Sequence, residues 1–167
     1  MTETADVPSS PVAQSLLRLV PIVTTFTISM CHFDQHLILS SFLPAAAPPH
    51  NSPRVLAHVM REYVQGVLPV MLAMDFLAYG CFAANVYYRV RLWRWYGVGL
   101  VFFLSHLANA PYSWKRLVAI QYGEDGTAEK DGKTAQRDAL EEFVRMNKMR
   151  LVLTELPLLA IAVAGAL

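Results

Sequence analysis

The chain has 167 residues, of which 54% are hydrophobic and only 16% are charged. This composition is more apolar than that of ordinary soluble domains and predicts an integral membrane protein. The 14 basic and 13 acidic residues nearly balance, which gives a net charge of +1. There is therefore no polycationic surface for a nucleic-acid backbone, and we expect no nucleic-acid partner.

Four apolar stretches are each long enough for a transmembrane helix, which needs about 20 residues. In chain order they cover residues 16–43, 63–88, 95–114 and 149–167. The intervening residues 115–148 form the only strongly polar region. Within it, 122–133 is rich in glycine and charge and predicts a loop, whereas 134–147 has apolar residues at helical spacing and predicts a short amphipathic surface helix.

The expected fold is all-α. Short connections, and the intolerance of lipid for irregular backbone, favour an up-down-up-down bundle of four transmembrane helices, with the amphipathic helix directly before the last of them. We expect residues 1–167 to form a single membrane domain in contact with lipid. The sequence leaves the oligomeric state open.

Ionisable residues interrupt all four apolar stretches. Such groups are costly at membrane depth, so each is a candidate functional residue. A helical rise of about 1.5 Å per residue places them at similar depths in one half of the membrane, where they would line a common cavity. Alternatively, these residues form hydrogen bonds or ion pairs between helices and have a structural role. The expected catalytic residues are His32, His36, Asp75, His106 and Glu155.

Asp34 is the exception among these polar positions. Two residues at about 100° each place it on the opposite side of the first helix from His32 and His36. Either the first helix is polar on two faces because it is central to the bundle, or Asp34 meets a different neighbour or a second subunit.

The chemistry expected in this cavity is general acid–base catalysis, because histidine titrates near neutral pH. His32 and His36 also have the i, i+4 spacing that can present two imidazoles to one metal ion, with His106 and Asp75 or Glu155 as further candidate ligands. The glutamate of an HExxH motif is absent. We therefore expect no metal or other cofactor, and the metal site remains the alternative.

Three short motifs follow one another in an order that resembles a known family. They are Tyr63-Val-Gln-Gly66-Val-Leu-Pro69, Ala110-Pro111-Tyr112-Ser113 and Phe143-Val-Arg-Met-Asn147-Lys-Met-Arg150. In these motifs the chain resembles the anthrone oxygenase-like family of small four-helix membrane proteins. Two differences stand out: the family's Pro-Thr-Asn after the third helix is missing, and Phe143 stands where the family has tryptophan.

The resemblance implies a tailoring enzyme of fungal secondary metabolism, multi-pass in the endoplasmic reticulum, that oxidises a hydrophobic anthrone-like polyketide with dioxygen and no evident cofactor. A buried base would remove an acidic C–H proton, and the resulting carbanion or phenolate would react with oxygen. Asn147 and Arg150 would bind a substrate oxyanion at the cavity mouth. The residues expected to contact substrate are Asp34, Tyr63, Asn109, Tyr112, Asn147 and Arg150.

Two other functions stay open at this stage. The same histidines and carboxylates would also suit epoxide hydrolysis or cyclisation of a polyketide or terpenoid. Alternatively, the chain is a non-catalytic membrane subunit or a small transporter whose buried polar residues hold partners or relay protons.

Overall fold

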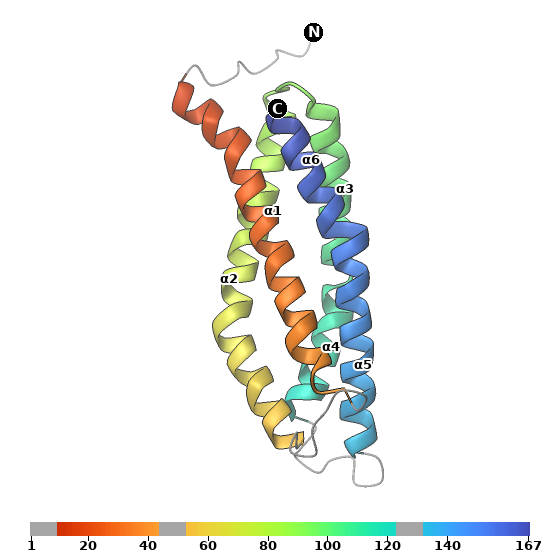
Figure 1. The fold of residues 1–167 in the computed structure, drawn as a ribbon. Helices are drawn as coiled ribbons and strands as arrows, with labels where there is room; N and C mark the ends of the chain where they lie inside the picture. The colour runs from red at the N-terminus through yellow and green to blue at the C-terminus, as the bar shows by residue number, and fades with distance from the viewer. Residues whose placement is uncertain (1–9, 44–52, 123–131) are drawn as a thin grey trace.

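The computed structural model describes residues 10–43, 53–122 and 132–167, and every regular element in these ranges is helical. The helices lie side by side along one long axis, with the start of α1 and the end of α6 at the same end (Figure 1). The all-α prediction is confirmed. The elements are α1 (Pro11–Ser40), α2 (Pro53–Tyr87), α3 (Trp93–Ala108), α4 (Ala110–Tyr122), α5 (Gly132–Arg150), the π-helix η1 (Leu151–Glu155) and α6 (Leu156–Ala166).

Three helices in the described part of the chain are long and apolar enough to cross a membrane. They are Pro11–Ser40, Arg54–Tyr87 and the continuous helical stretch Gln136–Ala166. Large apolar side chains cover their outer faces, such as Phe76, which is 70% exposed. Helix α3 has only 16 residues and is too short to span a bilayer by itself.

The first two helices begin earlier than their apolar stretches predict. Helix α1 starts at Pro11 and α2 at Pro53, and proline is well suited to the first turn because its missing N–H has no helical partner there. The added turns of α2 are polar on average, yet Leu56 and Met60 are buried on one face. In both cases helical structure continues beyond the apolar stretch.

The third predicted helix is interrupted where the sequence suggests continuity. Pro111 has no N–H to donate to the carbonyl of Leu107, and the helix breaks between α3 and α4. At the break, Asn109 donates its backbone N–H to the carbonyl of His106 at 3.1 Å and its side-chain amide to the carbonyl of Ser105 at 2.9 Å. Helical structure then resumes up to Tyr122, into the region predicted to be polar and non-membrane.

The amphipathic helix is present, but it is neither short nor separate from the last apolar helix. Helix α5 continues through η1 into α6. Its apolar residues Leu140 and Phe143 are buried in a cluster with α1, α2 and α4 rather than lying on the surface. The apolar stripe of this helix therefore packs within the protein.

The π-helix η1 widens the last helix by one residue. Pro157 cannot donate to the carbonyl four residues before it and crowds that carbonyl, so the preceding turn opens. The N–H of Leu156 bonds instead to the carbonyl of Leu151, five residues earlier. As a result Arg150 and Glu155 both reach the inside of the bundle, although in a regular α-helix they would lie about 140° apart.

Two apolar clusters stabilise the bundle, one at each end. The cluster nearer the start of α2 contains Leu39, Leu56, Met60, Leu117, Ile120, Ala139, Leu140, Phe143 and Val144. The cluster at the other end contains Ile28, Ala78, Phe82, Tyr96, Phe103, Leu158, Ile161 and Ala162. The buried ionisable residues belong to neither cluster. They form a polar layer between them.

Gly99 of α3 should be sensitive to substitution because a Cβ atom there would collide with the Phe82 ring. Phe82 is fully buried and held edge-on between Tyr96 and Phe103, at centroid distances of 5.3 Å to each. Overpacking such a site costs about 1–3 kcal/mol, so Gly99→Ala should lower the free energy of unfolding by that amount. Gly97→Ala is the matched control, since no atom lies within 4 Å of its added Cβ. Unfolding in detergent measures both, and equal stability of the two variants would contradict the packing described here.

Candidate functional site

Five ionisable side chains from different elements meet in the polar layer. They are His32 of α1, Asp75 of α2, His106 of α3, Arg150 of α5 and Glu155 of η1. His32 and Glu155 are each 1% exposed. Buried charges are costly unless they are paired or bound to a metal ion, so this cluster is the main candidate site in the described residues.

His106 is at the centre of the cluster. Its Nδ1 lies 2.9 Å from Glu155 Oε1, and its Nε2 lies 3.7 Å from Asp75 Oδ2. The guanidinium of Arg150 contacts Nε2 closely. A guanidinium can only donate, so Nε2 must accept, and we assign the ring proton to Nδ1, facing Glu155. This arrangement gives a neutral imidazole oriented by a carboxylate, which is the arrangement of a general base and its positioning partner.

His32 lies beside His106 with a different environment. The two rings meet edge to face, with centroids 5.7 Å apart. His32 Nδ1 is 3.1 Å from the backbone carbonyl of Ile28, to which it donates, and 3.9 Å from Glu155 Oε1. The backbone bond leaves His32 Nε2 as a free acceptor, available to a proton, a substrate or a metal ion.

The carboxylates of the cluster are incompletely satisfied. Glu155 Oε1 is in contact with the ring nitrogen of His106, whereas Glu155 Oε2 and Asp75 Oδ1 have no hydrogen-bond partner among the described residues. With both imidazoles neutral, two carboxylates face one guanidinium and the cluster carries a net charge of −1. One added cation, whether a proton on an imidazole or a ligand, would balance it.

A cavity of about 470 Å³ opens onto this cluster. His32, Asp75, His106 and Arg150 lie on its polar side, whereas Glu155 is behind the histidines and does not line it. The rest of the wall is mostly apolar and includes Leu68, Met71, Leu72, Leu107, Trp114, Leu117 and Phe143. A largely apolar pocket with a few polar groups at one side fits a hydrophobic small molecule with an oxygen function.

A smaller cavity of about 300 Å³ lies next to the first and shares Asp75 and His106 with it. It lies between α2 and α3, and its wall includes Phe76 and Leu104, which are 70% and 56% exposed. These residues belong to the apolar outer surface. The cluster is therefore reached from the side of the bundle as well as through the larger cavity.

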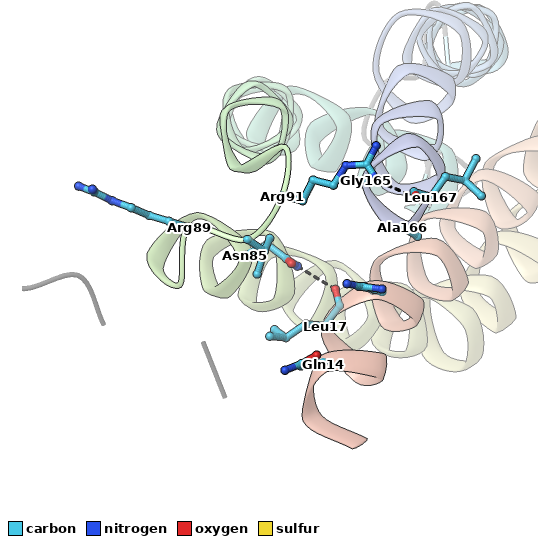
Figure 2. A pocket seen from close by; sticks show the side chains of 10 residues that line it. Gln14, Leu17, Asn85, Arg89, Arg91, Gly165, Ala166 and Leu167 are labelled. Carbon is cyan, nitrogen blue, oxygen red and sulfur yellow. Dashed lines mark hydrogen bonds between the residues drawn. The ribbon is translucent and has the colours of Figure 1, made fainter. Parts of the chain in front are cut away.

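A separate hollow of about 250 Å³ lies near the start of α1 and the end of α6 and has different chemistry. Its basic side chains are Arg18, Arg89 and Arg91, and among the described residues its lining contains neither histidine nor a carboxylate side chain. In Figure 2, Asn85 donates to the carbonyl of Leu17, at 2.8 Å, while Arg89 points away from the other side chains. This hollow lacks the groups for acid–base catalysis.

The structure brings together most of the residues predicted to be catalytic. His32, Asp75, His106 and Glu155 are in the cluster. His36 is half-buried on α1, and it does not line the cavity. The i, i+4 pair of histidines is therefore split.

Among the residues predicted to contact substrate, Arg150 and Tyr63 line the cavity. Asp34 is exposed, in agreement with its predicted facing, and Asn109 is exposed and caps Ser105 as described above. Tyr112 is exposed and donates to Glu142 at 3.1 Å.

Asn147 is fully buried but does not line the cavity, because its side-chain amide donates to Gln35 Oε1. Gln35 does line the cavity, and sequence reasoning missed it. The available signal was its i, i+3 spacing from His32, which places both residues on the same buried face of α1.

The chain is similar to two named proteins of fungal secondary metabolism. It is 23% identical to "Probable epoxidase scpX" of Mollisia scopiformis in an alignment 167 positions long, which covers 91% of this chain and 94% of that protein. It is 28% identical to "Oxaleimides biosynthesis cluster protein N" of Penicillium oxalicum over 118 residues, 63% of this chain and 65% of that protein. No family model and no solved structure matches the chain.

These similarities support the predicted role in secondary metabolism at a coarse level. Neither name mentions an anthrone, so the family resemblance inferred from the motifs remains a prediction. The word epoxidase describes the relative from Mollisia scopiformis.

Proposed function

We propose that the protein is a membrane-embedded tailoring enzyme that oxygenates a hydrophobic polyketide-like or terpenoid-like molecule. The observation that carries this proposal is the His106–Glu155 pair with Arg150 beside it, buried at the polar side of an apolar cavity. The name of the relative from Mollisia scopiformis supports an oxygenation as the reaction class.

The proposed chemistry begins with removal of a proton by His106. A substrate whose CH₂ group is made acidic by a nearby carbonyl, as in an anthrone, would place its oxygen against Arg150. Arg150 then turns from the imidazole to the developing oxyanion, which frees His106 Nε2 to accept the proton. Glu155 stabilises the imidazolium that forms.

The carbanion then reacts with dioxygen to give a hydroperoxide, and the imidazolium returns the proton. Loss of water leaves a ketone, so CH₂ and O₂ become C=O and H₂O without an external reductant. Exclusion of bulk water by the apolar wall protects the intermediate.

The membrane arrangement is part of the same proposal. Helices α3 and α4 together provide the fourth span in an up-down-up-down bundle, with the break at Asn109 within the membrane. The opening between α2 and α3 then faces lipid, and a hydrophobic substrate enters from the bilayer. In a fungal cell we expect this membrane to be the endoplasmic reticulum.

Epoxide opening is the second candidate, and a specific observation favours it. Asp75 lines the cavity with its Oδ1 unpartnered among the described residues, as a nucleophilic carboxylate would be. In that reaction water supplies the oxygen atom, whereas in an oxygenation dioxygen supplies it. A non-catalytic subunit would do neither, and deleting its gene would cause no precursor to accumulate.

Isotope labelling separates these reactions. Purified protein in lipid nanodiscs is given an anthrone under ¹⁸O₂, and we expect ¹⁸O in the product at a rate above that of the spontaneous oxidation. His106→Ala protein in the same nanodiscs serves as the background. Rapid quenching limits exchange of the ketone oxygen with water. In native extracts, a product labelled from H₂¹⁸O and formed without oxygen uptake would contradict oxygenation and favour epoxide opening.

A further inference from the structure

We infer that His32, His106 and Glu155 form a binding site for one divalent transition-metal ion. The inference rests on the proposed function for the cavity and the class of substrate, but an ion bound to His106 would take the place of the proton that His106 accepts in that scheme. It departs from the cofactor-free chemistry expected from the sequence. It also removes His36 from the candidate ligands and retains His32, His106 and Glu155.

The spacing of the three residues fits a single metal ion. One candidate ligand atom from each of the three residues lies within 4.8 Å of the others, and all three residues are buried. They come from α1, α3 and η1, so the bundle as a whole holds them in place. Two imidazoles and one carboxylate are the donor set of the facial triad, which leaves open coordination positions and is typical of non-haem Fe(II) sites.

The buried carboxylates of the cluster have unsatisfied acceptors. Buried carboxylate oxygens are normally hydrogen-bonded, paired or bound to a metal ion. Glu155 Oε2 and Asp75 Oδ1 have no hydrogen-bond partner among the described residues, although Glu155 is 1% exposed. A missing cation would satisfy them. Asp75, 3.7 Å from His106 Nε2, is close enough to become a fourth ligand or to bind a metal-bound water.

The cavity gives a substrate access to the proposed metal site. His32 and His106 line the cavity, whereas Glu155 is behind them. The free positions of an ion held by this triad would therefore face the cavity and the substrate. A site closed on all sides would be structural, whereas an open position is characteristic of catalytic metals.

Arg150 is a cation that would compete with a metal ion for the same cluster, and its position affects the net charge there. It contacts His106 in the structure, so it must move when His106 binds metal, and Ser113 Oγ at 3.5 Å from its Nη1 is an existing alternative partner. A divalent ion would neutralise Asp75 and Glu155 and leave Arg150 with one positive charge. That charge is available to an anionic oxygen of the substrate.

The test uses Co²⁺ as a probe with the full chain in lipid nanodiscs. Chelator-stripped protein is incubated with Co²⁺, freed of unbound metal and analysed for cobalt by mass spectrometry. We expect retention of about one ion per chain. His32→Ala and His106→Ala should each weaken binding by at least the roughly 10- to 100-fold that loss of an outer-shell partner costs. His36→Ala, on the same helix but outside the cluster, should bind as the wild type does.

A second measurement needs no variant and keeps the test decisive if one misfolds. X-ray absorption at the cobalt edge should show imidazole nitrogen and carboxylate oxygen ligands. Failure of the folded wild type to retain cobalt, or sulfur ligation, would overturn the site. Turnover by metal-free protein that retains no cobalt would overturn the site and leave the proposed function standing, whereas metal binding at the triad without any turnover would support the site and contradict the function.

Discussion

Replacing His106 with alanine is expected to lower kcat/KM for oxygenation by about 10²- to 10⁴-fold, the usual contribution of a general base. His106 lies between Glu155 and Arg150 and lines the cavity, so its imidazole is placed to take a proton from a bound substrate. Alanine removes that acceptor and leaves the apolar wall in place. Oxygen uptake by protein in nanodiscs, with the product quantified by mass spectrometry, measures the effect.

The matched control for this prediction is His36→Ala. His36 is a histidine of α1 one helical turn beyond His32, but it does not line the cavity. We expect its replacement to leave kcat/KM unchanged. If His106→Ala protein of native size and helix content oxidised the substrate as fast as the wild type, His106 would not be the base. If His36→Ala were the damaging change, the site would lie elsewhere on α1.

Depth along the helices was the part of the site that the sequence predicted well. Counting residues at a fixed rise places His32, Asp75, His106 and Glu155 in the same half of the membrane, and the structure brings these four side chains together. This works because membrane-spanning helices are long and nearly parallel. Position along the chain then translates directly into depth.

The sequence predicted less well which side of its helix each residue lies on, because this depends on the exact number of residues per turn. The π-helix η1 shifts the phase by one residue, so Arg150 joins Glu155 in the cluster although α-helical periodicity separates them. Pro157 is the signal for this change, since a proline inside an apolar helix disturbs the turn before it. Pro111 similarly ends α3, which leaves Asn109 exposed rather than in the cavity.

Polar contacts between helices could not be derived from the sequence. Asn147 was predicted to bind substrate, but it donates to Gln35, a residue 112 positions earlier in the chain. An amide looks the same in a sequence whether it contacts a ligand or a neighbouring helix, and only the packing of α1 against α5 decides between them. The same limit applies to His36. Its spacing from His32 suggests that both imidazoles enter the cavity, but α1 is oriented so that only His32 does.

Replacing Arg150 with methionine is expected to lower the free energy of unfolding by about 3–5 kcal/mol, the usual cost of removing one partner from a buried ionic cluster. Arg150 interacts electrostatically with Glu155 and Asp75. Methionine keeps much of the side-chain volume but leaves two carboxylates without their cation. Unfolding in mixed detergent, followed by the loss of helical signal, gives the change in stability.

Two further variants identify the cause of that loss. Asp75→Asn in the Arg150→Met background removes one of the uncompensated charges, so the double variant should be more stable than Arg150→Met alone. Arg116→Met is the control for loss of an arginine as such, since Arg116 pairs with Glu142 outside the cavity, and exposed ion pairs contribute little. If Arg116→Met were as destabilising as Arg150→Met, the effect would reflect side-chain packing. That result would mean that Arg150 stabilises the protein by packing and not by its charge. It would contradict the pairing of Arg150 with the carboxylates.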